Sequence, residues 1–235
     1  MAHHATHEAV RLEVGPVACD GDLGIPERAT GLVIFAHGSG SSRFSRRNQS
    51  VAARLEAAGF GTLLLDLLTP QEAAIDESTR EYRFDIELLG RRVVGAADWA
   101  QARPELHRLP VAFFGASTGA AAALIAAAER PDLTRAVISR GGRPDLAGEA
   151  LHRVQAPTLL IVGGNDEPVI EMNRGAMSRM RAPVHLQIVP GATHLFEERG
   201  ALEEVSRLAT EWCQRYLRAY PPEGLDGIAP GELGE

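Results

Sequence analysis

The sequence contains no lysine, so all 24 of its positively charged side chains are arginine. Schiff-base chemistry, a Ser–Lys dyad and a Walker-type phosphate loop are therefore excluded, because each needs a lysine. Cysteine is almost as scarce. Cys19 and Cys213 lie far apart and have no Cys-x-x-Cys spacing, so we expect neither a disulfide framework nor a zinc site. Two free thiols suit a reducing compartment, and we expect a cytoplasmic protein.

Other absences limit the partners of the chain. No apolar run preceded by positive charge stands near the start, so no secretory signal is expected. The net charge is −7 and the arginines are scattered, which leaves no basic face for nucleic acid. His3, His4 and His7 lack the supporting groups that fix metal ligands. We expect no metal, no cofactor, no membrane or nucleic-acid partner, and a small-molecule substrate.

The chain of 235 residues is 45% hydrophobic, which favours one α/β domain over residues 1–219. The segment 220–235 is rich in Pro and Gly, and we expect it to be loosely ordered. Apolar strands alternate with helical patterns through most of the chain, which predicts a mostly parallel sheet with helices on both faces. Strands are expected at 11–18, 31–36, 60–65, 135–139, 158–162 and 184–189, and another begins at Val111 and runs into the glycine-flanked segment 115–119.

Two connections bear on the site. The strand at 11–18, followed by a turn at 20–22, predicts an antiparallel start. The polar stretch 66–82 is long enough to form a small flap over the site. Only a short helical piece, 146–153, separates two later strands, so no cap domain is expected.

Ser117 lies at the junction of an apolar strand and an alanine-rich helix, within Gly115-Ala-Ser-Thr-Gly119. A serine between two glycines suits a tight strand-to-helix turn that exposes its hydroxyl. The helix that follows directs its free amides and its positive end to the place where an oxyanion would form. The pentapeptide alone also arises by chance, so its partners must come from elsewhere in the chain.

Three other strand ends supply reactive groups, and the carboxyl ends of parallel strands gather at one edge of a sheet. They are His37-Gly-Ser-Gly40, Gly164-Asn-Asp166 and Gly191-Ala-Thr-His194. The order serine, acid, histidine is that of α/β hydrolases.

Each partner has a rival. Glu167 and Asp66 are alternatives to Asp166, and His185 is the alternative to His194. His185 falls inside a predicted strand, which favours a packing role. His107 and His152 are expected to be solvated.

On these four motifs the chain resembles α/β hydrolases of the dienelactone hydrolase-like group, over residues 32–217. The resemblance implies an α/β-hydrolase fold without a cap domain. It departs at the nucleophile, because the enzyme that gives the group its name uses cysteine where this chain has Ser117. A dienelactone substrate is therefore not expected.

The chemistry expected is acyl transfer to water. Ser117 needs His194 to accept its proton, and Asp166 would orient the imidazole and stabilise its charged form. The amide of Thr118 and one from Ser39 or Gly40 would bind the oxyanion. His37 is expected to shape this loop and not to exchange protons. The alternatives are an acyltransferase that uses the same triad and a hydrolase-fold binding protein without activity.

Arginines follow two of the strand ends: Arg43, Arg46, Arg47, Arg140 and Arg143. Because guanidinium groups grip carboxylates and phosphates, Arg43, Arg140 and Arg143 are candidates to bind a negatively charged substrate. The alternative is that they pair with nearby acids such as Asp145 or remain solvated.

Overall fold

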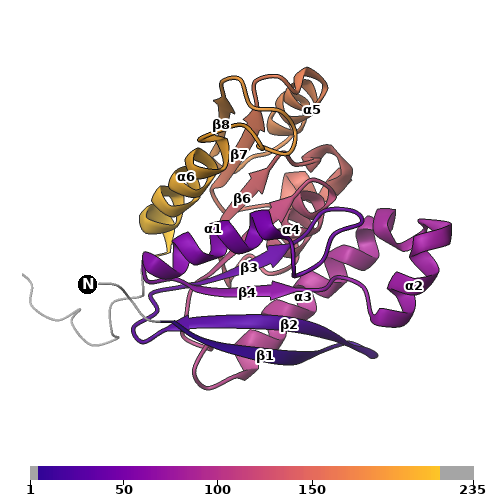
Figure 1. Ribbon diagram of the computed structural model, residues 1–235, viewed down its shortest axis with the longest axis vertical. Helices are drawn as coiled ribbons and strands as arrows, with labels where there is room; N and C mark the ends of the chain where they lie inside the picture. The colour runs from indigo at the N-terminus through magenta and orange to yellow at the C-terminus, as the bar shows by residue number, and fades with distance from the viewer. Residues whose placement is uncertain (1–4, 218–235) are drawn as a thin grey trace, which may run out of the picture.

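A computed structural model describes residues 5–217, and its ribbon is drawn in Figure 1. Eight strands form one sheet: β1 Ala5–Val14, β2 Val17–Pro26, β3 Leu32–Ala36, β4 Gly61–Leu65, β5 Val111–Ala116, β6 Thr134–Arg140, β7 Thr158–Gly163 and β8 Val184–Val189. Their spatial order is β1-β2-β4-β3-β5-β6-β7-β8. β1, β2 and β4 pair antiparallel, whereas every pair from β4 to β8 is parallel.

Helices cover both faces of this sheet (Figure 1). They are α1 Arg46–Ala57, α2 Pro70–Thr79, α3 Ile86–Ala102, α4 Thr118–Glu129, α5 Glu167–Met177 and α6 Ala201–Tyr216, with short 3₁₀ segments η1 Tyr82–Phe84 and η2 Pro144–Arg153. β3, β4, β5 and β7 consist mostly of apolar residues because both of their faces are buried.

The sheet therefore separates two apolar cores. One core packs α3, α4 and η2 against the sheet and contains Leu12, Phe113 and Leu124. The other packs α1 and α6 and contains Phe114 and Trp212. This architecture confirms the predicted α/β fold with a mostly parallel sheet, and η2 is the connection between β6 and β7.

The structure corrects the predicted start of the chain. The strand predicted at 11–18 contains a turn, because β1 and β2 form a long hairpin in which Val14 pairs with Val17. Gly15 has a φ of +68°, a conformation that glycine adopts without steric cost and that closes a two-residue turn. The antiparallel start is as predicted, but the turn expected at 20–22 is wrong, because these residues lie inside β2 and pair with β1.

The stretch 66–82 is also more regular than its polar composition predicts. It contains helix α2, whose first turn is closed by a capping box between Thr69 and Glu72. The pattern Thr-Pro-Gln-Glu was the signal for this helix. The tail prediction for 220–235 lies outside the described residues. Of the helices between residues 5 and 217, none has both the length and the apolar character needed to span a bilayer.

Candidate active site

Ser117 occupies a strained turn between β5 and α4. Its φ of 51° and ψ of −123° lie in a region that residues with side chains rarely occupy, and such strain is concentrated at functional sites. A Cβ at Gly115 would overlap the backbone of Ala120, and one at Gly119 would overlap the carbonyl oxygen of Ala36. Both glycines are therefore required by close packing. The Ser117 amide donates to the carbonyl of Arg140 (3.2 Å), which fixes the turn to β6.

His194 and Asp166 meet at the same edge of the sheet. His194 Nδ1 lies 2.7 Å from Asp166 Oδ2. Because a carboxylate only accepts hydrogen bonds, the proton belongs on Nδ1, and Nε2 is left as the basic nitrogen. The Asp166 side chain is 14% exposed and that of His194 is 39% exposed, so the pair is supported by protein on one side and open on the other.

The His194 loop is held beside the Ser117 turn. Gly141 follows the residue that bonds the Ser117 amide, and a Cβ placed on Gly141 would lie 3.6 Å from Cε1 of His194. Asn165 ties the acid loop to the histidine loop through its side chain to Gly191 O (2.9 Å). Among the described residues, the Ser117 hydroxyl has no hydrogen-bond partner.

The rivals of these residues are engaged elsewhere or face solvent. Glu167 is exposed at the start of α5. Asp66 accepts hydrogen bonds from the backbone and side chain of Arg43. His185 lies in β8 and stacks edge-on against Trp212, with ring centroids 5.3 Å apart. Asp166 and His194 are thus the acid and histidine that the fold brings together.

The loop after β3 passes directly over the Ser117 turn. A Cβ on Gly38 would lie 3.1 Å from Cβ of Ser117. The hydroxyls of Ser39 and Thr118 are 2.9 Å apart, so this loop is tied to the first residue of α4. Gly40 has a φ of +68°, which turns the chain at this point. The three residues predicted to form an oxyanion hole are therefore brought together.

His37 joins this loop to the segment after β4. Its Nε2 accepts a hydrogen bond from the amide of Leu67 (3.1 Å), and its Nδ1 lies 2.9 Å from the carbonyl oxygen of Gly38. These bonds require the neutral imidazole with its proton on Nδ1. Burial disfavours the charged imidazolium and therefore lowers the pKa of His37, which agrees with this neutral form. His37 therefore positions the loop, as its place in the sequence predicts.

The lowered pKa of His37 predicts a loss of stability on acidification. Below about pH 6.5 the unfolded chain binds a proton that folded His37 binds only at lower pH, so stability falls as pH falls. We expect the free energy of unfolding in urea to decrease between pH 7 and pH 5. His37→Gln should reduce this pH dependence, whereas His152→Gln, at an exposed position, should not. An equal dependence in His37→Gln and the wild type would contradict this role.

The three candidate arginines differ in their partners. Arg43 is paired with Asp66 and with Asp22, and Arg143 is paired with Asp145 (2.7 Å). The hydrogen bond from Arg143 to Asp145 raises the pKa of Arg143. For these two residues the structure supports pairing with protein acids, the alternative reading of the sequence.

Arg140, at the end of β6, is different. It is only 7% exposed, and its Nη2 donates to Asn48 Oδ1 (3.3 Å). Its Nε is buried without a partner, and no carboxylate among the described residues pairs with it. Burial and then the charge of Arg47 lower the pKa of Arg140 to about 10. The guanidinium therefore remains charged at neutral pH without a protein counter-ion.

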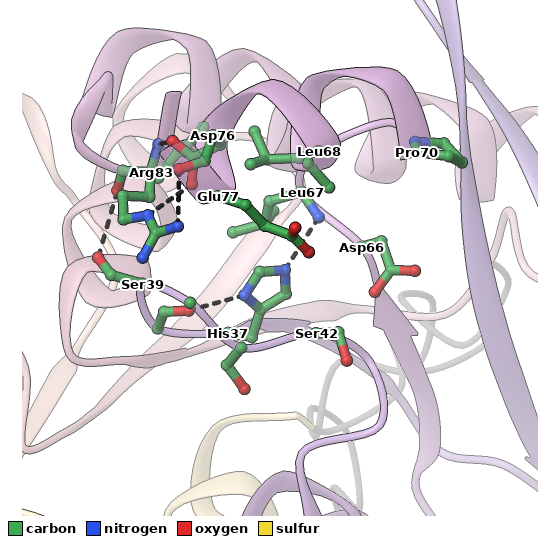
Figure 2. Close-up of a pocket in the computed structure, with 15 residues that line it drawn as sticks. His37, Ser39, Ser42, Asp66, Leu67, Leu68, Pro70, Asp76, Glu77 and Arg83 are labelled. Atoms are coloured by element: carbon green, nitrogen blue, oxygen red, sulfur yellow. Dashed lines mark hydrogen bonds and ion pairs between the residues drawn. The ribbon is translucent and has the colours of Figure 1, made fainter. Parts of the chain in front are cut away.

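A cavity of about 320 Å³ lies between the loop after β3 and α2 (Figure 2). Its wall includes neither Ser117 nor His194, but it includes Gly40 and Ser39, whose hydroxyl contacts Thr118 next to the Ser117 turn. Arg83 and Glu77 line it and were missed by sequence reasoning, because α2 was not foreseen.

Residues 5–217 contain no group of three or more His, Cys, Asp or Glu side chains suited to a metal ion.

Comparison with known proteins identifies relatives of this chain. The model of the dienelactone hydrolase family matches residues 19–218. The crystal structure of a dienelactone hydrolase from Anabaena variabilis is 57% identical, with a TM-score of 0.90, over 92% of this chain and 100% of that one. A dienelactone hydrolase-like promiscuous phosphotriesterase from metagenomic libraries is 19% identical, with a TM-score of 0.75, over 91% and 99% of the two chains, and shows the fold alone.

Two curated proteins from Mycobacterium tuberculosis are 53% identical over 217 residues. Each bears the name "Putative phosphoribosyl transferase". The match covers 92% of this chain and 48% of each relative, so the chain spans about half the length of the curated relatives it matches. Their name describes proteins about twice as long as the matched segment.

Proposed function

The chain belongs to the dienelactone hydrolase family, and from this premise we propose that it is a serine hydrolase that cleaves a small ester, lactone or thioester. The observation that carries the proposal is the bond between His194 and Asp166 beside the strained turn of Ser117. A strained backbone conformation of this kind is not expected at a residue that serves only packing. The family supports hydrolysis in general, and these residues support the serine mechanism in particular.

In the proposed mechanism Ser117 Oγ attacks the substrate carbonyl and passes its proton to His194 Nε2. Asp166, bonded to Nδ1, keeps Nε2 unprotonated before attack and stabilises the imidazolium afterwards. The protonated His194 then donates to the departing alcohol or thiol. Substrate binding must bring Ser117 Oγ and Nε2 within hydrogen-bond reach, and such bonds commonly tighten only in the complex.

The developing oxyanion would accept hydrogen bonds from the Thr118 amide and from an amide of Ser39 or Gly40. Thr118 begins α4, so its amide has no partner within the helix, and the helix dipole favours negative charge there. The tie between the Ser39 and Thr118 hydroxyls supports this assignment because it holds the two donors in fixed relation. Each donor of this kind contributes about 2.7–4 kcal/mol to the barrier reduction.

Water would complete the reaction by attacking the acyl-enzyme with His194 as the base. The 39% exposure of His194 favours hydrolysis over transfer to a second alcohol, because solvent reaches the base. An ester panel with and without an acceptor alcohol tests this choice. A new ester product in place of the free acid would identify an acyltransferase.

We also propose a cytoplasmic location, which the free cysteines Cys19 and Cys213 support.

We further propose that Arg140 binds a negatively charged group of the substrate. Of the three candidate arginines it is the one without a carboxylate partner in the described part of the chain. Arg140 ends β6, which lies on the His194 side of β5, so we propose that the group it binds belongs to the leaving alcohol, which His194 protonates.

The test of Arg140 uses two esters that share an acyl group and differ in an alcohol that ends in a carboxylate or in the matching primary amide. We expect kcat/KM to favour the carboxylate by about 10- to 100-fold, as for a hydrogen bond to a charged group. Arg140→Gln should remove the preference; because it also removes the bond to buried Asn48 Oδ1, its Tm is measured alongside. The proposed role of Arg140 would be contradicted if the wild type and Arg140→Gln preferred the carboxylate ester equally, or if Arg140→Gln lowered kcat/KM equally for both esters.

A further inference from the structure

The cavity between the loop after β3 and α2, here called the α2 cavity, has an apolar floor and a charged rim. Its apolar lining consists of Leu67, Leu68, Pro70, Ala73 and Leu89. Its volume of about 320 Å³ lies at the lower end of the range for small-molecule sites. A group of modest size with an apolar stem would therefore fit it.

The carboxylates that line the α2 cavity are not equivalent. Asp66 is neutralised by Arg43, as described above. Asp76 is buried and receives hydrogen bonds from the Arg83 side chain and from the amides of Tyr82 and Arg83. Burial alone would raise the pKa of Asp76, but these bonds hold it below its usual value. Both carboxylates are thus already satisfied by protein partners.

Glu77 is the exception. It is exposed, and no hydrogen bond or ion pair within residues 5–217 engages its carboxylate. In Figure 2 its side chain extends from α2 so that the carboxylate lies within the ring of residues that line the cavity. The net charge presented to a ligand here is therefore negative and comes from Glu77.

The helix that carries Glu77 is held in place at both ends. The capping box of Thr69 and Glu72 fixes its first turn, and Glu72 also accepts a bond from Arg92 on α3 (2.6 Å). At the other end Asp76 binds Arg83, whose carbonyl accepts a hydrogen bond from Ser39 (3.3 Å). The backbone of Glu77 is consequently held in a fixed position relative to the loop over Ser117.

The position of the α2 cavity decides which half of an ester it receives. It lies at the ends of β3 and β4, whereas β6, β7 and β8, which lead to Gly141, Asp166 and His194, lie on the other side of β5. In the function proposed above, the leaving alcohol must depart next to His194, because that residue protonates it. The acyl group then extends away from His194, across the loop of Ser39 and Gly40.

Resting on that proposed function, we propose that the α2 cavity holds the acyl group and that Glu77 selects acyl chains ending in a positively charged or hydrogen-bond-donating group. The Glu77 carboxylate attracts an ammonium group at the end of the acyl chain and repels a carboxylate group there, while the methylene groups of the chain pack against the apolar lining of the cavity. Hydrolysis adds water across the ester bond and needs no further reactant. Glu77 is thus a specificity residue that contacts substrate without taking part in bond breaking.

The test uses three esters of one alcohol, with 6-aminohexanoyl, heptanoyl and adipoyl groups of matched length. We expect kcat/KM to fall in that order, with about a tenfold ratio between the first and the last, as partly exposed charges allow. Glu77→Gln should bring the ratio of aminohexanoyl to adipoyl ester close to one. Glu81→Gln removes the same charge from an exposed residue outside the cavity and should keep the ratio.

The outcomes separate the two proposals. If Ser117-dependent hydrolysis occurs but the wild type shows no charge preference, or Glu77→Gln retains it, the assignment of Glu77 is wrong and the hydrolase function stands. If none of the three esters, and none of a wider ester panel, is cleaved, the proposed function itself fails. Raising the salt concentration should reduce the ratio in the wild type and in Glu81→Gln, because screening weakens exposed charge interactions.

Discussion

Replacing Ser117 by alanine is expected to lower kcat for ester hydrolysis by about 10⁶-fold, the loss found when the nucleophile of a serine triad is removed. In the proposed mechanism Ser117 forms the covalent bond, and the sequence contains no lysine that could activate or replace it. Because the substrate pocket remains, KM should change much less than kcat. Steady-state kinetics on the best ester of the panel measures both constants.

The matched control is Ser50→Ala, at an exposed position on α1. It should retain wild-type kcat and Tm. Ser117→Ala should keep the fold. Alanine has the same Cβ as serine and leaves the strain at φ 51° unchanged, so Tm should stay near that of the wild type. A Ser117→Ala variant that folds normally and retains more than a small fraction of kcat would exclude the proposed mechanism.

Asp166→Asn is expected to lower kcat by about 10⁴-fold while the fold persists. An asparagine amide can donate to His194 Nδ1, which places the imidazole proton on Nε2. That nitrogen can then no longer accept the serine proton. The 2.7 Å bond between Asp166 and His194 is the contact that this substitution alters, and the measurement is kcat together with its pH profile.

Glu167→Gln is the control for Asp166→Asn. It changes the adjacent acid, which is exposed at the start of α5, and should leave kcat within about twofold of the wild type, as is usual for surface substitutions. The opposite result, a large loss in Glu167→Gln and a small one in Asp166→Asn, would reassign the acid of the triad.

The site was predictable because its residues follow strands. In a parallel sheet the carboxyl ends of strands meet at one edge, so Ser117, Asp166 and His194 could be placed together from their positions after apolar runs. The Gly115 and Gly119 pattern marked the turn because only glycine fits the close backbone approach. These features depend on local sequence and on one general rule of topology.

What the sequence did not reveal depends on contacts between distant residues. Arg43 pairs with Asp22 and Asp66, which lie 21 and 23 positions away, and no local pattern predicts that choice. Hydrophobic periodicity does not predict helix α2, because α2 buries few of its residues in the core. Thr69 and Glu72, which form its capping box, are the sequence signal for its start. Glu77 could be recognised only once α2 was known to border the cavity.

The central claim, that Ser117 is an activated nucleophile, is tested most directly by labelling with a fluorophosphonate probe, read as the intact mass of the protein. The account predicts one adduct on the wild type, located on the peptide containing Ser117, and none on Ser117→Ala under the same conditions. Absence of labelling on folded wild-type protein, or equal labelling of Ser117→Ala, would contradict it.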